Sequence, residues 1–350
     1  MKQLLLEKAE SLVLVDVPVP QISDDEVLVE VKYCGICGSD VHALHDGVTV
    51  PAGTYLGHEF SGVISEVGKN AKKWHVGDRV VVNPMYVCGE CYACKHGRES
   101  ICEHYLDYAI GLSVGIEYGG AFAKYVRVAQ PDRRIQILPD AVSFEEGSLV
   151  EPLACSLHGI RKSIFQPRDR VMIIGAGMIG LGVAAHLRNA GAGLVVVAEI
   201  DDNKSALAKK LGADHVFNPA TDKEVKDKVL DLTDGLGVDI VFECSGVPQV
   251  YNGITQYLRK GGQLLMQGVI SQNVELYAMD WVLNEYQLQG SLCYYSDEFP
   301  MVTEFLSRHV SPVNEMITSK IKLSNIIKDG FGKLTRPGSH DIKIIVEPDV

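Results

Sequence analysis

The chain has 350 residues, which is enough for two domains of ordinary size, each with its own core. Hydrophobic residues make up 46% and charged residues 22%, a globular composition that excludes a disordered or fibrous protein. The formal net charge of -12 opposes non-specific binding to nucleic acid or to an anionic membrane, so we expect neither as a partner.

The N-terminal run, the longest apolar stretch and the spacing of the cysteines together indicate the cellular compartment. The apolar run at the N-terminus is too short for a signal peptide, because Glu7 interrupts it. The longest uncharged apolar stretch, Val171–Leu187, contains four glycines, which favours a strand, a turn and a helix over a membrane span. Four of the nine cysteines are spaced like metal ligands, which indicates a reducing compartment. We therefore predict a cytoplasmic protein.

The first third of the chain is predicted to be rich in β-strands. Apolar residues alternate with polar ones in Val27–Tyr33, and shorter strands are expected at Phe60–Val67 and Arg79–Val82. The turns between these strands contain glycine.

A possible catalytic metal site follows the first of these strands. Cys37, His58 and Glu59 supply a thiolate, an imidazole and a carboxylate, all good ligands for Zn²⁺. Three such ligands leave a fourth position for water or substrate, which is typical of catalytic zinc. Two other interpretations compete. Cys34 and Cys37 form a C-x-x-C that could be a redox pair, and a His-Glu dipeptide is often only a surface feature.

A second cysteine cluster is expected to bind a structural metal ion. Gaps of two, two and seven residues separate its members, which are Cys88, Cys91, Cys94 and Cys102. Four neighbouring thiolates repel one another unless a cation neutralises them, and a closed tetrahedral zinc site is the simplest solution. An iron-sulfur cluster is the main rival, but bacterial ferredoxin runs end with a gap of three and a proline, whereas Glu103 follows here.

Glu151 lies at the approach to the second half of the chain. Because it precedes Pro152, its backbone is expected to be extended. From the residues alone, Glu151 is best interpreted as a surface acid.

From about residue 168 the pattern changes to alternating strands and helices. We predict a strand at Val171–Ile174, a helix at Met178–Ala190 and a strand at Leu194–Ala198. The turn before the helix contains a G-x-G-x-x-G motif, and Glu199 closes the next strand 24 residues after the first glycine. This context indicates dinucleotide binding. The residues of the turn assigned to the cofactor are Gly175, Gly177, Met178, Ile179 and Gly180.

Glu199 also bears on the choice of cofactor. Its carboxylate would accept hydrogen bonds from the adenosine ribose hydroxyls and would repel the additional phosphate of NADP, so we predict NAD.

The remaining elements continue the alternation and imply a doubly wound parallel sheet. They are a helix at Lys204–Leu211, a strand at Val238–Glu243, a helix at Gln249–Arg259, a strand at Leu264–Val269, helices at Pro300–Arg308 and Asn325–Leu334, and a strand at Ile342–Val346.

Together these motifs resemble the zinc-dependent, medium-chain alcohol dehydrogenases, from about Val27 to Val346. The resemblance implies an α/β protein with a GroES-like β-rich catalytic domain, residues 1–154 and 291–350, and a Rossmann NAD-binding domain, residues 155–290. It implies two zinc ions per chain. The four clustered cysteines would hold the structural zinc, and the catalytic zinc would be held by Cys37, His58 and Glu59, with Glu151 a ligand in some states or water-bridged in others. Asp40 would orient His58.

The resemblance also implies the chemistry, which is the oxidation of an alcohol. Ser39 would take the proton and pass it through the ribose hydroxyls to His42 near solvent. Lys204 matches the family's ribose-binding lysine, and Ser245 is also assigned to the cofactor site. Without the resemblance, Ser39 could be a turn residue and His42 a surface histidine.

Within the family, several segments resemble the butanediol and sorbitol dehydrogenase branch, which acts on secondary alcohols, diols and polyols and is usually tetrameric or dimeric. The loop Ala43–Leu56, however, is closer in length to the galactitol 1-phosphate type. Three alternatives therefore stay open: a sugar-alcohol-phosphate dehydrogenase, a threonine dehydrogenase, and a non-catalytic dinucleotide-binding sensor. A zinc-dependent nucleic-acid binder is opposed by the acidic composition.

Overall fold

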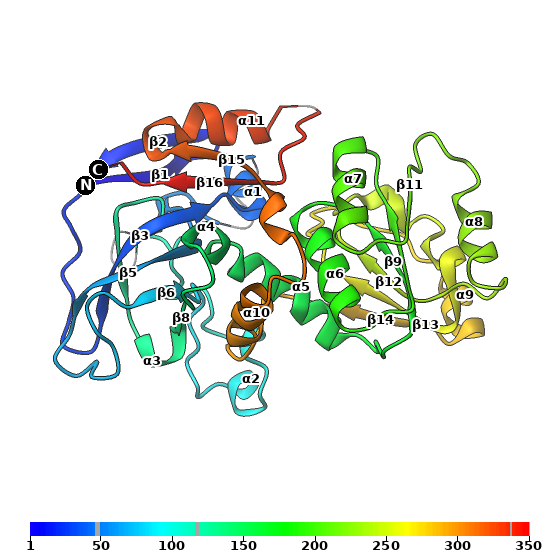
Figure 1. The fold of residues 1–350 in the computed structure, drawn as a ribbon, viewed down its shortest axis with the longest axis horizontal. Coiled ribbons are helices and arrows are strands. Elements are labelled where there is room, and N and C mark those ends of the chain that lie inside the picture. The colour runs from blue at the N-terminus through cyan, green and yellow to red at the C-terminus, as the bar shows by residue number, and fades with distance from the viewer. Residues whose placement is uncertain (46–49, 116–118, 337, 350) are drawn as a thin grey trace. The chain divides into compact units, whose positions relative to one another are not determined.

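The computed structural model describes residues 1–45, 50–115, 119–336 and 338–349, and the chain divides into two compact units (Figure 1). The first unit comprises Met1–Glu151, Tyr295–Arg308 and Met316–Val350, and the second comprises Pro152–Tyr294 and His309–Glu315. The predicted combination of a β-rich part with a doubly wound parallel sheet is confirmed.

The first unit is built on two sheets. The smaller has the order β2-β1-β4, and the larger has the order β15-β16-β3-β5-β6-β8, with β7 also paired to β3. The strands are β1 (Lys2–Lys8), β2 (Ser11–Asp16), β3 (Val27–Gly35), β4 (Thr54–Tyr55), β5 (Glu59–Val67), β6 (Arg79–Val82), β7 (Tyr125–Val128), β8 (Ile135–Ile137), β15 (Ile317–Lys322) and β16 (Lys343–Glu347).

Helices in the first unit are mostly short. They are α1 (Gly38–His45), α2 (Tyr92–Lys95), η1 (Glu99–Ile101), α3 (Pro131–Arg134), α4 (Phe144–Gly147), α10 (Glu298–Ser307), η5 (Leu323–Asn325), the π-helix η6 (Ile326–Phe331) and α11 (Gly332–Leu334). The alternation of β3 is realised, because Val27, Val29 and Val31 are buried in one hydrophobic core with Phe60 and Ile64 of β5.

The second unit is a six-stranded parallel sheet in the order β11-β10-β9-β12-β13-β14. Its strands are β9 (Arg170–Ile174), β10 (Leu194–Ala198), β11 (His215–Phe217), β12 (Val238–Glu243), β13 (Leu258–Met266) and β14 (Gln287–Gly290). Its helices are α6 (Met178–Asn189), α7 (Asp202–Lys210), α8 (Val225–Asp231), η2 (Pro248–Tyr251), η3 (Ile254–Tyr257) and α9 (Ala278–Asn284). Two more helices cross the bounds of the unit: α5 (Val150–Lys162) begins two residues before it, and η4 (Val313–Met316) ends one residue beyond it. Every residue of β12 is buried, as expected for a central strand.

Two expectations about local structure were wrong. A continuous helix at Gln249–Arg259 is replaced by η2 and η3, because Gly253 between them adopts a left-handed conformation, and β13 already begins at Leu258. Glu151 is neither extended nor a surface acid: it is buried in the first turn of α5, where Pro152 is tolerated because its missing N–H would have had no partner in the helix.

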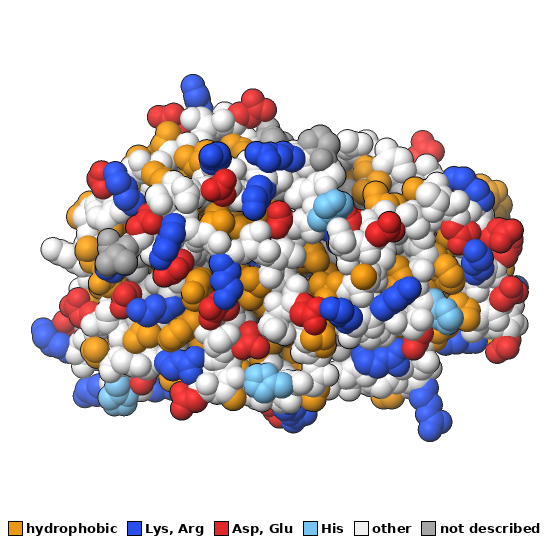
Figure 2. Space-filling model, turned by 45° about the horizontal axis from the view of Figure 1, so that its top comes forward, with side chains coloured by type: hydrophobic (Ala, Val, Ile, Leu, Met, Phe, Trp, Pro, Cys, Tyr) orange, Lys and Arg blue, Asp and Glu red, His pale blue; other side chains and the backbone are white. Residues whose placement is uncertain are grey.

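Acidic and basic side chains are interspersed on the face of the molecule shown in Figure 2. Some form exposed ion pairs, such as Lys322 with Glu347 at 2.7 Å, and such pairs add little to stability. The two units are therefore stabilised chiefly by their apolar cores.

Among the described residues, no helix has both the length and the apolar character that crossing a membrane requires.

Candidate active site

The antiparallel pairing of β3 with β5 brings the predicted catalytic ligands together. Gly35 at the end of β3 lies opposite Glu59 at the start of β5, so Cys37, just past β3, comes close to the His58–Glu59 pair. The candidate ligand atoms of Cys37, His58 and Glu59 all lie within 4.8 Å of one another. His58 and Glu59 are buried and Cys37 is half-buried.

Residues of α1 and the turn before it orient this group. Asp40 is fully buried; its Oδ1 lies 3.6 Å from His58 Nδ1, and its Oδ2 accepts a hydrogen bond of 2.9 Å from the Cys37 backbone N–H. The other ring nitrogen, His58 Nε2, lies 3.4 Å from Ser39 Oγ. A carboxylate on Nδ1 that leaves Nε2 for a metal ion is the usual arrangement around a zinc-bound histidine.

Glu59 has a basic partner that sequence reasoning missed. Lys343 of β16 is only 2% exposed, and its Nζ donates to Glu59 Oε2 at 2.5 Å and to the Ile36 carbonyl at 2.9 Å. Glu59 Oε1 is buried and has no hydrogen-bond partner among the described residues. A buried, unpartnered carboxylate oxygen beside a thiol and an imidazole fits a bound cation. The sequence did hold a signal for Lys343, since it is the one charge between the apolar residues Ile342 and Ile344.

The surroundings of His58 favour its charged form. Burial opposes a charge on the ring, but Asp40 and Cys37 raise the pKa of the imidazole well above its usual value. A zinc ion binding here would have to displace that proton, so the affinity for zinc falls as the pH falls.

Glu151 is near this group without being part of it. Its charge raises the pKa values of His58 and Lys343, yet its carboxylate is not among the atoms that lie within 4.8 Å of one another. The described structure thus brings together three of the four predicted catalytic ligands.

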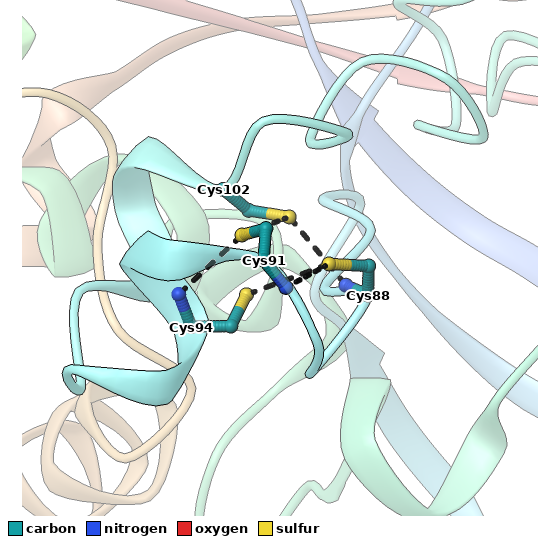
Figure 3. A group of neighbouring side chains, drawn as sticks. All are labelled: Cys88, Cys91, Cys94 and Cys102. Carbon is teal, nitrogen blue, oxygen red and sulfur yellow. Dashed lines mark hydrogen bonds between the residues drawn. The ribbon is translucent and has the colours of Figure 1, made fainter.

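The four cysteines of the second cluster also converge, around the short helix α2 (Figure 3). Cys88 Sγ lies 3.8 Å from Cys94 Sγ, and Cys91 Sγ lies 4.0 Å from Cys102 Sγ. Tetrahedral zinc with Zn–S bonds of ~2.3 Å places sulfurs ~3.8 Å apart, so these spacings fit the ion.

Backbone N–H groups point at the same sulfurs. Those of Cys94 and Glu103 lower the pKa of the Cys91 thiol to about 6, whereas burial raises that of Cys94 to about 12. The cluster is thus partly prepared to hold thiolates, and a cation would complete their stabilisation.

The glycine motif lies at the carboxyl end of β9, as predicted. Gly175 has a positive φ of 93°, and a Cβ on Gly180 would lie 1.9 Å from the Gly175 carbonyl oxygen, so only glycine fits at position 180. A Cβ on Gly177 would meet nothing within 4 Å. Gly177 caps α6, so the N-terminus of a twelve-residue helix faces an open position suited to a pyrophosphate.

Glu199 and Ser245 flank this turn. Glu199 Oε2 accepts a hydrogen bond of 2.6 Å from Ala176 N–H, and its Oε1 accepts from Ile200 and Asp201 N–H groups. Ser245 follows β12, and its Cα would lie 2.9 Å from a Cβ added to Gly175. Lys204, half-buried in the first turn of α7, follows the Asp201 cap.

Both halves of the chain match families of known proteins. Residues 23–140 match the model of the alcohol dehydrogenase GroES-like domain, and residues 178–308 match that of the zinc-binding dehydrogenases. The D-arabitol-phosphate dehydrogenase of Enterococcus avium is 35% identical over 97% of this chain and 94% of its own. The chain belongs to the zinc-dependent medium-chain alcohol dehydrogenase family.

Other members of the family are similar along their whole length. The sorbitol dehydrogenase of Bacillus subtilis is 30% identical over 100% of this chain and 98% of its own. The crystal structure of 2R,3R-butanediol dehydrogenase from Bacillus subtilis superposes with a TM-score of 0.89 at 31% identity, over 99% of both chains.

The resemblance predicted from the motifs is thereby confirmed, and the two parts of this alcohol dehydrogenase are the GroES-like and Rossmann domains. The protein is an oxidoreductase that acts on CH–OH groups, and zinc and NAD(H) fit as its cofactors.

Proposed function

We propose that this dehydrogenase oxidises a secondary hydroxyl group of a polyol or diol and transfers the hydride to NAD. The observation that carries the proposal is the convergence of Cys37, His58 and Glu59, in which one Glu59 oxygen has no hydrogen-bond partner among the described residues. The named activities of the sorbitol and butanediol dehydrogenases support the substrate class.

Cys37, His58 and Glu59 would hold the catalytic zinc, with Glu151 a further ligand or a water-bridged one. A zinc ion there supplies Lewis-acid polarisation of the substrate hydroxyl. Asp40, whose Oδ1 lies 3.6 Å from His58 Nδ1, would orient the His58 ring, and Lys343 holds Glu59. The four clustered cysteines would hold the structural zinc.

Ser39 and His42 would remove the proton. Ser39 Oγ is on the Nε2 side of His58, next to the expected position of the substrate hydroxyl, so it can accept that proton while it releases its own hydroxyl proton toward His42. His42 is exposed three residues further along α1 and can exchange the proton with solvent.

The dinucleotide would cross the turn Gly175–Gly180, with Met178 and Ile179 at the start of α6 and Ser245 on the other side. Glu199 and Lys204 would bind the adenosine ribose. The Glu199 carboxylate disfavours the 2′-phosphate of NADP.

A polyol phosphate is the second candidate substrate. The D-arabitol-phosphate dehydrogenase is 35% identical to this chain, which is the observation in its favour. The loop Ala43–Leu56, which suggested a phosphate-type relative, includes residues 46–49, outside the described residues.

For the functional domains we propose residues 1–154 with 291–350 as the catalytic domain and residues 155–290 as the coenzyme domain. A cytoplasmic location would suit a chain in which four closely spaced cysteines can hold a metal ion.

A homo-oligomer, dimeric or tetrameric, is supported by an apolar surface on the Rossmann domain, which we name the α9–β14 surface. It combines the edge strand β14 with side chains that are about half to three-quarters exposed: Tyr277, Met279, Val282, Leu283 and Leu288. An edge strand can pair with the same strand of a second copy, which lets one surface bury itself.

The test is to follow NADH formation with sorbitol, xylitol, the butanediols and D-arabitol phosphates, using protein shown to contain two zinc ions per chain. Wild type should oxidise one of these classes. Cys37→Ser should lose about 10³-fold or more in kcat, because a zinc ligand is removed. Cys155→Ser, which replaces a half-buried thiol outside both clusters, should behave like wild type.

Full activity of Cys37→Ser would refute the assignment of the zinc site. No turnover of any polyol, diol or phosphate would refute the substrate class, while NAD binding by the same protein would show that the Rossmann site works.

A further inference from the structure

Glu243, a buried acid that the mechanism above does not use, lies at the carboxyl edge of the parallel sheet, where we propose that the cofactor binds. Glu243 is the last residue of β12 and is fully buried. Among the described residues no basic side chain pairs with it, whereas the buried Asp239 at the other end of β12 is paired with Arg259 at 2.5 Å.

Hydrogen bonds from the following turn hold the Glu243 carboxylate. Its Oε1 accepts from Ser245 N–H at 2.7 Å, from Ser245 Oγ at 2.5 Å and from Gly246 N–H at 3.0 Å, while Oε2 accepts from Tyr251 Oη at 3.2 Å. These four donors suit an ionised carboxylate, which can only accept hydrogen bonds. Burial and the Glu243 charge both raise the pKa of Tyr251, which keeps its hydroxyl a donor.

The packing around this carboxylate is tight. A Cβ on Gly268, just beyond β13, would lie 2.4 Å from Glu243 Oε2, and Ser245 packs against Gly175 of the glycine motif. Glu243 therefore fixes a turn that itself borders the dinucleotide turn.

The order of the strands indicates which half of the cofactor would lie near the turn after β12. The chain winds from β9 outward to β10 and β11 and then returns to β12 on the opposite side of β9, so the crevice between β9 and β12 is the topological switch point. Since the adenosine half lies toward Glu199 at the end of β10, the nicotinamide half lies toward the end of β12.

We propose that Glu243 is a positioning residue for the nicotinamide half of the cofactor, and that its buried charge makes the site favour NAD⁺ over NADH. The nicotinamide ring is cationic in NAD⁺ and neutral in NADH, so a negative charge in a weakly polar region stabilises the oxidised form selectively. The inference rests on the proposed use of NAD at this edge.

Binding of NAD⁺ and of NADH, measured separately by fluorescence titration of the zinc-loaded enzyme without substrate, tests the proposal. Glu243→Gln keeps an acceptor for Ser245 and Gly246 but removes the charge, so the ratio of the NAD⁺ to the NADH dissociation constant should rise about threefold or more. Glu243→Asp keeps the charge but withdraws it from the turn, so both nucleotides should bind more weakly and in equal proportion.

The matched control is Asp239→Asn, which removes a buried carboxylate from the amino end of the same strand, about 13 Å away. It should bind both nucleotides as wild type does. A Glu243→Gln ratio within about twofold of wild type would overturn the charge effect, and wild-type affinities in Glu243→Asp would overturn the positioning role, so the second variant decides even where the first does not fold. Failure of wild type to bind either nucleotide would instead refute the proposed cofactor site itself.

Discussion

At the scale of single residues, the ion pair between Lys343 and Glu59 is expected to matter most when zinc is absent. Both side chains are at most 2% exposed, so removing one partner leaves the other charge buried without compensation. Lys343→Met should lower the free energy of unfolding of the zinc-depleted protein by about 3–5 kcal/mol. The zinc-loaded variant should lose less, because the cation is a second partner for Glu59.

Thermal unfolding with and without a chelator measures this effect. Lys320→Met is the matched control, because Lys320 forms an exposed pair with Glu145 at 2.9 Å and such pairs contribute little. Equal losses in the two variants would show that the buried pair has no special role.

Glu199 is expected to determine the preference for NAD. In Glu199→Ser the charge that repels a 2′-phosphate is gone, so the ratio of kcat/KM with NADP to that with NAD should rise about tenfold or more, which corresponds to about 1.4 kcal/mol. Comparing both cofactors in one variant cancels any general damage from losing the acceptor for Ala176 N–H. Glu224→Ser, at an exposed acid before α8, should leave the ratio unchanged; an unchanged ratio in Glu199→Ser would exclude this role.

At the scale of elements, α6 contains a histidine that makes the Rossmann domain sensitive to acid. Burial lowers the pKa of His186 to about 4, although its Nε2 contacts the Leu153 carbonyl at 3.2 Å. Below the unfolded pKa of about 6.5 the unfolded chain takes up a proton that the folded ring refuses, so stability falls as the pH falls. At about pH 5 the loss amounts to about 2 kcal/mol.

His186→Gln should remove this part of the pH dependence, since glutamine keeps a polar group in α6 but does not titrate. The measurement compares the melting temperatures of both proteins from about pH 7 to pH 5. Loss of zinc in acid affects the two proteins alike, so the difference between their slopes isolates His186. Identical slopes would mean that folding does not lower the pKa of His186.

The elements also show which parts of the fold the sequence could predict. Strands such as β6 and β10 coincide with their predicted ranges, because their apolar runs and flanking glycines are local signals. The region after β12 was mispredicted, because one left-handed residue, Gly253, divides a helix-like pattern into η2 and η3. Likewise, local spacing pointed to Cys37, His58 and the four clustered cysteines, whereas Lys343 lies 284 residues from its partner Glu59 and is brought to it only by the sheet.

At the scale of the whole molecule, the α9–β14 surface is expected to control assembly. Leu283 is 69% exposed on α9, a helix with no buried residue, and burying such side chains against a second copy removes apolar area from water. Leu283→Glu would place a charge in that contact and, by symmetry, a second charge from the partner copy, so the oligomer should dissociate toward the monomer. Sedimentation or light scattering over a range of protein concentrations measures the mass. Leu236→Glu changes a leucine that is 60% exposed and does not belong to this surface, and it should keep the wild-type mass. A wild-type monomer, or an oligomer that Leu283→Glu does not weaken, would refute the role of the α9–β14 surface in assembly.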